Sequence, residues 1–235
     1  MIQKKNVLTI AGSDSSGGAG IQADIKTFEA LNVYSASVIT SITAQNTTGV
    51  HSVYDLPVQI ISEQLDAIFS DINIVAIKIG MLKRPDYINL ISDKISHLET
   101  VVTVLDPVMV STSGHSLIDD DAQKALTENL FPLTHLITPN IPEAATLLKK
   151  ESLWVEHNMS LACQLMFESF NLNAILLKGG HMKGDTCIDT LAIKNLKTSQ
   201  IETQTFTYQK INTANSHGTG CSLSSAITAY LAQGK

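Results

Sequence analysis

Short runs of apolar and β-branched residues recur along the chain and alternate with amphipathic stretches. The runs cover residues 7–11, 36–43, 74–79, 101–105, 136–138 and 174–177. Short, continuously apolar runs are typical of strands buried on both faces, and their alternation with helical stretches is typical of a parallel sheet. The pattern therefore predicts a mostly parallel sheet covered by helices.

Two of the amphipathic stretches carry apolar residues at helical spacing. Residues three and four positions apart lie on one face of a helix, so each set predicts one buried stripe. The two sets are Ile21, Ile25, Phe28 and Leu31, and Val58, Ile61, Leu65 and Ile68.

The last part of the chain predicts a pair of strands and then a helix. Residues 186–193 and 201–208 are strand-rich and are expected at an antiparallel edge of the sheet. After Gly220 the large apolar residues repeat on one helical face, while serines and Gln233 occupy the other, a pattern that normally turns the apolar face to the core. The apolar face consists of Leu223, Ala226, Ile227, Tyr230 and Leu231.

Composition narrows the class of protein. No repeat, low-complexity tract or linker divides the 235 residues, so we expect one domain over residues 1–235. A formal charge of −6 offers no broad cationic surface for nucleic acid. No segment approaches the roughly 20 apolar residues that span a bilayer, and the apolar run near the start is too short for a signal peptide. The expected partners therefore include neither nucleic acid nor membrane.

Three cysteines, Cys163, Cys187 and Cys221, are scattered along the chain. Their spacing fits neither a disulfide framework nor a zinc site. A reducing compartment suits such a chain, so we expect a cytoplasmic protein.

Two glycine-rich segments are the first candidates for ligand binding. Residues 11–24, AGSDSSGGAGIQAD, end a strand and begin a helix, where glycine amides can approach a ligand and the helix terminus favours negative groups. The spacing is not that of a dinucleotide fingerprint, and the absence of GxxxxGK[ST] argues against a P-loop kinase. Taken alone, the segment is equally consistent with a tight strand-to-helix turn.

The second segment, SHGTGCSLSSA at residues 216–226, begins the last predicted helix. Amides from Gly218 through Cys221 can converge on a phosphoryl oxygen and form an anion hole. The same helix terminus is expected to lower the pKa of the Cys221 thiol, as a general base for an alcohol requires. Without the glycines, a lone cysteine would more simply be a small buried hydrophobe.

Polar residues also follow three predicted strands. Asp106 lies in LDPVM, Asn140 and Glu143 in TPNIPEA, and Lys178 in ILLKGGH. Ligands gather beyond the carboxyl ends of parallel strands, and oxygen ligands of this kind suit Mg²⁺ held mainly through water and phosphate. Asn140 also fits an ordinary helix N-cap, and Lys178 a strand-end lysine that reaches solvent. His181 and His217 can cap or orient the backbone, and their spacing fits no metal site.

Seven segments together resemble one enzyme family, the hydroxymethylpyrimidine/phosphomethylpyrimidine kinases of thiamine biosynthesis. The resemblance covers nearly the whole chain, and GTGC combined with AGSDSSGGAG is its most discriminating part. In chain order the segments are AGSDSSGGAGIQAD (11–24), TAQN (43–46), KIGML (78–82), LDPVM (105–109), TPNIPEA (138–144), LKGGH (177–181) and HGTGCSLSSA (217–226).

The resemblance implies a fold and an activity. The fold is a ribokinase-like three-layer α/β/α sandwich with a mostly parallel central sheet and antiparallel edge strands. The activity transfers the γ-phosphoryl group of ATP to the hydroxymethyl group of 4-amino-5-hydroxymethyl-2-methylpyrimidine, and then to the resulting monophosphate. ATP with Mg²⁺ and a homodimeric assembly are implied in the same way.

The resemblance also implies roles for individual residues. Cys221 becomes the base, and Gly218, Thr219 and Gly220 become the anion hole. The pyrimidine is read by Gln45, whose amide can both accept and donate a hydrogen bond. Its other contacts are polar groups of Gly12 and Asp24 and apolar walls of Ala19, Met81 and Val108. Asn140 and Glu143 become the residues that contact Mg²⁺ and phosphates, and Asp106 and Lys178 are expected near the nucleotide.

Three alternatives stay open from sequence. A pyridoxal or pyridoxine kinase shares the fold, although Gln45 favours the aminopyrimidine. A ribokinase-type sugar kinase is weakened because Cys221 stands where that class usually has aspartate. A catalytically silent pyrimidine-binding protein would keep the pocket without transfer. The chain ends directly after the GTGC helix, whereas family members usually continue, so the usual C-terminal helical segment is expected to be absent.

Overall fold

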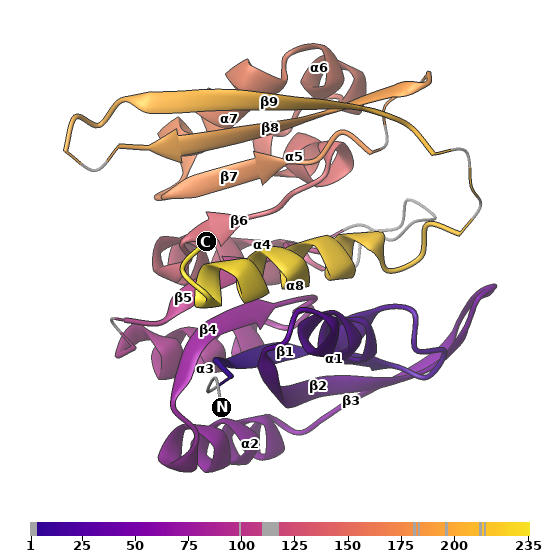
Figure 1. The fold of residues 1–235 in the computed structure, drawn as a ribbon, viewed down its shortest axis with the longest axis vertical. Coiled ribbons are helices and arrows are strands. Elements are labelled where there is room, and N and C mark those ends of the chain that lie inside the picture. Colours follow the sequence, from indigo (N-terminus) through magenta and orange to yellow (C-terminus); the bar gives the residue numbers. More distant parts are fainter. Residues whose placement is uncertain are drawn as a thin grey trace.

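The computed structural model describes residues 4–98, 100–109, 118–180, 182, 184–195, 197–211, 213 and 215–235. In this part of the chain nine strands form one sheet, in the order β3-β2-β1-β4-β5-β6-β7-β8-β9 (Figure 1). The strands are β1 (Asn6–Asp14), β2 (Tyr34–Asn46), β3 (Gly49–Asp55), β4 (Ile74–Ile79), β5 (Val102–Leu105), β6 (Leu136–Ile137), β7 (Ala174–Leu177), β8 (Thr186–Lys194) and β9 (Ile201–Gln209).

The centre of the sheet is parallel and both of its edges are antiparallel. Strands β2, β1, β4, β5, β6 and β7 run parallel, each to its neighbour. Strands β8 and β9 form the antiparallel edge that the sequence predicts. The other edge, β3 paired with β2, was not predicted. Because β3 is exposed along nearly its whole length, its residues carry no pattern of burial.

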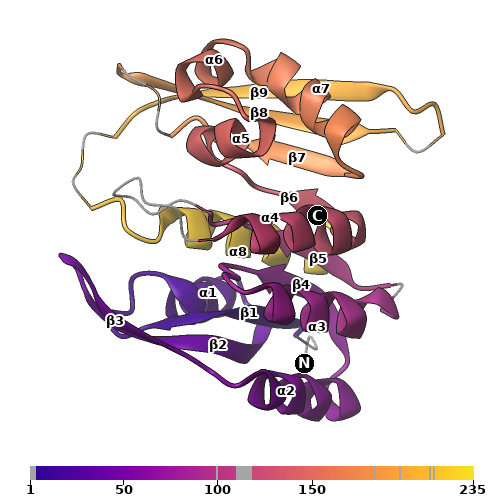
Figure 2. The same cartoon turned by 180° about the vertical axis from the view of Figure 1, so that it is seen from behind.

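Helices cover both faces of the sheet, which confirms the three-layer arrangement (Figures 1 and 2). Helices α1 (Gly20–Ala30) and α8 (Thr219–Ala232) lie side by side on one face. The other face carries α2 (Val58–Asp71), α3 (Pro85–Ser96), α4 (Asp120–Ala125), α5 (Ile141–Leu148), α6 (Ser152–His157) and α7 (Met159–Ser169). A π-helical turn (Leu126–Leu130) and a 3₁₀ turn (Phe131–Leu133) follow α4.

The larger hydrophobic cluster lies mainly between the sheet and helices α2 to α7. Ile61 and Leu65 of α2 are fully buried there, against strand residues such as Ile77. A smaller cluster, which includes Phe28 of α1 and Ala229 of α8, lies on the opposite face. The predicted stripes of α1 and α2 therefore supply core residues. Among the described residues, no helix combines the length and apolar character needed to cross a membrane.

Helix α8 turns to the sheet small side chains that hydrophobicity alone would leave outside. Its buried residues are Ser224, Ser225, Thr228, Ala229 and Ala232. The large residues Leu223 and Tyr230 are 37% and 43% exposed. Small side chains let a helix approach a sheet closely, and hydroxyls can be buried once they are hydrogen-bonded. Leu223 and Tyr230 therefore do not lie in the core as the apolar face predicts, whereas Ile227 and Leu231 of that face do pack against buried residues of the sheet.

Candidate functional site

The two glycine-rich segments meet at the carboxyl end of the sheet. Gly218 adopts the left-handed conformation, with φ of 79°, and a Cβ atom at this position would overlap the carbonyl oxygen of Gly18. Only glycine fits such a close approach without strain. The turn before α1 and the turn before α8 therefore form one continuous wall, although they lie some two hundred residues apart in the chain.

Asp14 joins these two turns. Its carboxylate accepts hydrogen bonds from the backbone amides of Ser16, Gly18 and Ala19 at 2.8, 3.2 and 2.8 Å. His217 Nε2 lies 2.9 Å from Asp14 Oδ2. Burial raises the pKa of Asp14, but the bonds from His217, Ser16 and Ala19 outweigh it and lower the pKa to about 2. Asp14 is therefore a charged anchor that connects the two turns.

Gln45, the residue predicted to read the pyrimidine, lies against this anchor. Its side-chain nitrogen is 3.1 Å from His217 Nε2. Its side-chain oxygen accepts from the Thr43 hydroxyl at 3.2 Å. The Thr43 hydroxyl therefore orients the Gln45 amide, and the His217 ring lies beside its nitrogen; because His217 Nε2 donates to Asp14, it does not also accept from Gln45.

Other residues predicted at the pyrimidine lie around the end of β1. A Cβ on Gly12 would lie 2.7 Å from Ser41 Oγ and 3.9 Å from Met81 Cε, so Gly12 and Met81 are neighbours. The Ser41 hydroxyl is buried and has no hydrogen-bond partner in the described part of the chain. Ala19 and Val108 are half-buried, at the turn before α1 and after β5 respectively.

Asp24 is fully buried. Both of its oxygens lie 2.9 Å from Lys78 Nζ. They also accept from the hydroxyls of Thr9, at 2.6 Å, and Ser225, at 2.7 Å. The carboxylate is therefore fully engaged by protein groups. Lys78 had no role predicted for it, yet a lysine inside the apolar run IVAIKI already signalled a buried partner.

A second buried pair lies at the ends of β5 and β7. Lys178 Nζ is 2.7 Å from Asp106 Oδ1, and the Thr138 hydroxyl donates to the same oxygen at 3.0 Å. The Lys178 side chain is only 13% exposed, so it does not reach into solvent as a strand-end lysine would. A Cβ on Gly220 would lie 3.4 Å from Asp106 Oδ2 and 3.5 Å from Lys178 Nζ. The predicted nucleotide residues thus lie directly beside the predicted anion hole.

Asn140 and Glu143 form a reciprocal cap at the start of α5. The Glu143 amide donates to Asn140 Oδ1 at 2.9 Å, and the Asn140 amide donates to Glu143 Oε2 at 2.7 Å. The cap reading of Asn140 is therefore confirmed, and it leaves Glu143 Oε1 outside this box. Burial raises the pKa of Glu143 to about 8, against the lowering effect of Lys178 and with the raising effect of Asp106.

These oxygens fit Mg²⁺ only as an ion held mainly by other ligands. No group of three or more His, Cys, Asp or Glu side chains in the described ranges is arranged as a metal cage. Mg²⁺ usually keeps several waters and binds through one or two carboxylates together with phosphate oxygens. The Glu143 carboxyl, beside Asp106, is the candidate for this role among these residues, although the backbone of Met109 also hydrogen-bonds to it.

Cys221 lies in the first turn of α8 and is half-buried. Burial has the largest effect on its thiol and raises the pKa, while Lys78 and the Gly20 amide lower it. The expectation of a lowered pKa was therefore wrong, because desolvation outweighs the helix terminus. The Thr219 amide donates to the Ser216 carbonyl at 3.3 Å. The amides of Gly220 and Cys221 belong to the first turn, whose amides have no partner within a helix.

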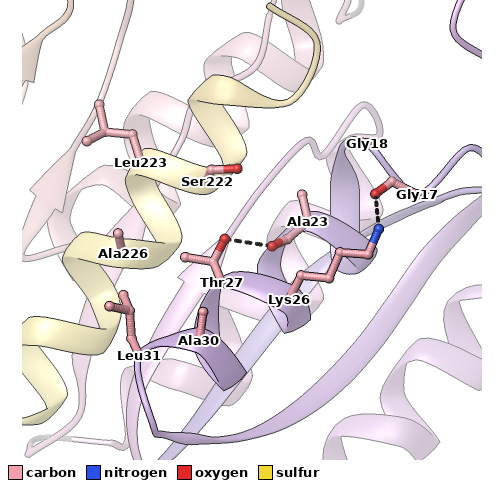
Figure 3. A pocket seen from close by; sticks show the side chains of 10 residues that line it. All are labelled: Gly17, Gly18, Ala23, Lys26, Thr27, Ala30, Leu31, Ser222, Leu223 and Ala226. Atoms are coloured by element: carbon pink, nitrogen blue, oxygen red, sulfur yellow. Dashed lines mark hydrogen bonds between the residues drawn. The ribbon is translucent and has the colours of Figure 1, made fainter.

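A groove of about 570 Å³ lies between α1 and α8 (Figure 3). Its walls are small and apolar side chains such as Ala23, Ala226 and Leu223, with Lys26 beside Gly17. None of the residues predicted for the pyrimidine or the nucleotide lines it. The groove therefore adjoins the site at Gly18 but contains none of those predicted residues. His181 lies outside the described residues.

A family model described as phosphomethylpyrimidine kinase matches residues 14–235. The chain belongs to this family. It is 46% identical over 231 residues to the hydroxymethylpyrimidine/phosphomethylpyrimidine kinase of Rhizobium meliloti, covering 97% of this chain and 82% of that protein. It is 44% identical over 229 residues to the thiamine biosynthesis bifunctional protein ThiED of Geobacter sulfurreducens, covering 97% of this chain and 45% of that one.

Solved structures give the same picture of the fold. The phosphomethylpyrimidine kinase of Clostridium difficile superposes with a TM-score of 0.82 at 43% identity, covering 99% of this chain and 92% of that one. A pyridoxal kinase from Staphylococcus aureus in complex with ADP gives a TM-score of 0.88 at 33% identity, covering 99% and 82%. The predicted ribokinase-like architecture is confirmed, and the family is that of phosphotransferases.

Proposed function

We propose that this protein phosphorylates 4-amino-5-hydroxymethyl-2-methylpyrimidine and then its monophosphate, with ATP as donor, in thiamine biosynthesis. The observation that carries the proposal is the meeting of the two glycine-rich turns at Gly18 and Gly218. Their junction brings the proposed base, Cys221, and the proposed pyrimidine reader, Gln45, to one end of the sheet. Both acceptors would use this one site.

The transfer step needs alignment and charge stabilisation more than covalent chemistry. Cys221 removes the proton of the hydroxymethyl group as its oxygen attacks the γ-phosphorus of ATP and the bond to ADP breaks. Amides at the start of α8, in the Gly218–Thr219–Gly220 turn, face the charge that develops on the transferred group. Lys178, held by Asp106, offers a fixed positive charge to the phosphates.

Recognition of the pyrimidine rests on the Gln45 amide. An amide can accept from the exocyclic 4-amino group and donate to a ring nitrogen, and the Thr43 hydroxyl helps to fix its orientation. Gly12, Ala19, Met81 and Val108 enclose the ring, as the resemblance implies. Asp24 contributes through its buried contacts to Lys78 and Ser225.

Mg²⁺, when bound, would neutralise charge on the phosphates of ATP. Glu143 would hold it through water, while Asn140 keeps Glu143 oriented through the reciprocal cap. Asp106 and Lys178 stand beside this position and define its charge. Glu143 would therefore hold the ion, and Asn140 would orient Glu143.

Pyridoxal is the second candidate acceptor. A pyridoxal kinase from Staphylococcus aureus shares this fold, but its identity of 33% is lower than that of the pyrimidine kinases of Clostridium difficile and Rhizobium meliloti, at 43% and 46%. An assay of ATP consumption with Mg²⁺ separates the two. We expect turnover with hydroxymethylpyrimidine and with its monophosphate, with each product identified by mass. Preference for pyridoxal would overturn the proposal.

The Cys221→Ala variant is the control for that assay. It should bind the pyrimidine in calorimetry with little change, yet lose most of its turnover, because no other group replaces the base. Since burial raises the pKa of Cys221, turnover of the unaltered protein should also rise as the pH increases and the thiolate fraction grows. Unchanged turnover in Cys221→Ala would remove its assigned role.

We also propose a cytoplasmic homodimer. The scattered cysteines suit a reducing compartment, and all three are free thiols. The hairpin of β2 and β3 leaves large apolar side chains exposed at an open sheet edge, with Ile42 paired across the strands to Tyr54. An exposed apolar edge of this kind favours contact with a second copy.

A further inference from the structure

A fully buried ion pair connects four elements beneath the start of α8. Lys78 of β4 and Asp24 of α1 have no solvent exposure, and Lys78 Nζ lies 2.9 Å from both carboxylate oxygens. Thr9 of β1 and Ser225 of α8 complete the bonds to Asp24, at 2.6 and 2.7 Å. A buried charge pair is retained only where its desolvation cost is offset by such bonds.

The helix geometry places Cys221 on the side of α8 that faces this pair. Cys221 and Ser225 are four residues apart, so they lie one above the other on the same helical face. Ser225 already bonds to Asp24, and Cys221 lies one turn nearer the carboxyl end of the sheet. Lys78 Nζ extends in that direction, since a Cβ on Gly80, just beyond β4, would lie 3.0 Å from it.

Four charged groups are electrostatically coupled to the Cys221 thiol. After burial, Lys78 has the largest effect and lowers the pKa of Cys221, whereas Asp24 and Asp106 raise it. Lys178 faces the thiol as well, since Cys221 contributes to raising the pKa of Lys178. In this set Lys78 is the cation with the strongest effect on the thiol.

We propose that Lys78 is a positioning residue for phosphoryl transfer: its buried ammonium, fixed by Asp24, stabilises the thiolate of Cys221. The inference rests on the role proposed above for Cys221 as the base. Lys78 is fully buried, so it acts through the thiol and not by direct contact with a ligand. Asp24 fixes the ammonium in place and also limits its effect, because its negative charge acts on the same sulfur in the opposite sense.

Two single variants of the pair separate this role from a structural one. Lys78→Met removes the cation and leaves Asp24, so the ionisation midpoint of Cys221 should rise. Asp24→Asn removes the anion and leaves Lys78, so the midpoint should fall. We expect shifts of about one pH unit, or tenfold in thiolate fraction at a fixed pH. Both variants should lower the free energy of unfolding, because each leaves a buried charge unpaired.

The measurement is the pH titration of thiolate ultraviolet absorbance, with the matching Cys221→Ser protein subtracted in each background. That subtraction removes the signals of Cys163 and Cys187. Loosening of the structure would move both midpoints in the same direction, whereas the proposed role moves them apart. Shifts in one direction, or no shift in folded variants, would overturn the proposal.

The double variant Lys78→Met with Asp24→Asn keeps the test decisive if a single variant fails to fold. Removal of a whole buried pair at similar volume is often neutral for stability. The ionisation midpoint of Cys221 in the double variant should lie above that of the unaltered protein and below that of Lys78→Met, because Lys78 has a larger effect on the thiol than Asp24. An unchanged midpoint in the folded double variant would also overturn the proposal.

The titration contains neither ATP nor acceptor, so its outcome is independent of which substrate the protein uses. The pH profile of turnover then connects the thiol titration with the proposed reaction. If the reaction is as proposed, the rising limb of the profile should shift with the thiol midpoint in each variant. A thiol shift without turnover on any pyrimidine would count against the proposed function, not against the coupling of Lys78 to Cys221.

Discussion

Asp14 shows how one carboxylate can connect the two turns of the candidate site. It accepts from three backbone amides of its own turn and contacts His217 of the distant turn before α8. Each bond requires the ionised form or favours it, which is why the pKa falls to about 2 although burial opposes this. The ionised form of Asp14 therefore stabilises the folded arrangement of the two turns.

Replacing Asp14 by asparagine should make the free energy of unfolding depend less on pH in the acidic range. The pKa of Asp14 is lower in the folded protein than its ordinary value of 3.8, so its contribution is present above about pH 4. It is lost as the pH falls toward 2. Asp14→Asn should lower the free energy of unfolding by about 2 kcal/mol at neutral pH and by much less near pH 2. Urea unfolding at several pH values measures this.

Asp71→Asn, at an exposed carboxylate, is the charge-matched control for Asp14→Asn. A loss that is equal at both ends of the pH range would show that Asp14 acts through shape alone. His217→Gln complements the test, because it removes the longest-range partner of Asp14 and keeps a polar side chain at the same position.

Single residues of the site differ in how far sequence could predict them. The turn glycines, Cys221 and the Asn140–Glu143 cap stand in recognisable motifs, and the structure brings them to one edge of the sheet. The partners of buried charges were not predictable in this way. Asp24 and Lys78 are 54 residues apart, and no local pattern says which carboxylate a buried lysine will meet.

At the scale of elements, α8 shows that the buried side chains of a helix need not be its most hydrophobic ones. Ser224 is fully buried and donates to the carbonyl oxygens of Gly220 and Cys221, at 3.0 and 3.1 Å. Leu223, its neighbour in sequence, lines the open groove against α1. Close contact between helix and sheet selects small side chains, a requirement that a hydrophobicity pattern does not register.

Exchanging these two residue types tests the orientation of α8. Ser224→Leu should lower the free energy of unfolding by about 1–3 kcal/mol, because the added carbons have no space. Leu223→Ser, the matched control at the adjacent position, should cost less, since Leu223 is 37% exposed. Urea denaturation followed by circular dichroism compares the two. A larger loss for Leu223→Ser would restore the orientation expected from sequence.

Most strands were predictable because they are short apolar runs. The predicted ranges 74–79 and 174–177 coincide with β4 and β7. Strand β3 was not, because its pairing with β2 depends on backbone bonds and not on buried side chains. Apolar runs therefore predict the centre of a sheet well and its edges poorly.

At the scale of the molecule, the β2–β3 edge is the surface we assign to the second copy. Tyr54 is 65% exposed and Ile42, its cross-strand partner, is 48% exposed. Tyr54→Glu should convert the proposed dimer to a monomer in sedimentation, because burying a new charge at an apolar contact is costly. The control is Tyr230→Glu on α8. Equal masses for both variants and the unaltered protein would place the contact elsewhere.

The junction of the two glycine turns also dictates when the site can exist during synthesis. His217 and Ser225 reach back across 203 and 201 residues to Asp14 and Asp24. A chain emerging from the ribosome can pair its first strands early, since folding proceeds from the amino terminus. Lys78 and Asp24 must wait, however, with one face uncovered, until α8 has been made. The proposed base, Cys221, therefore arrives with the element that completes its own surroundings, so no chain that stops before α8 holds an assembled site.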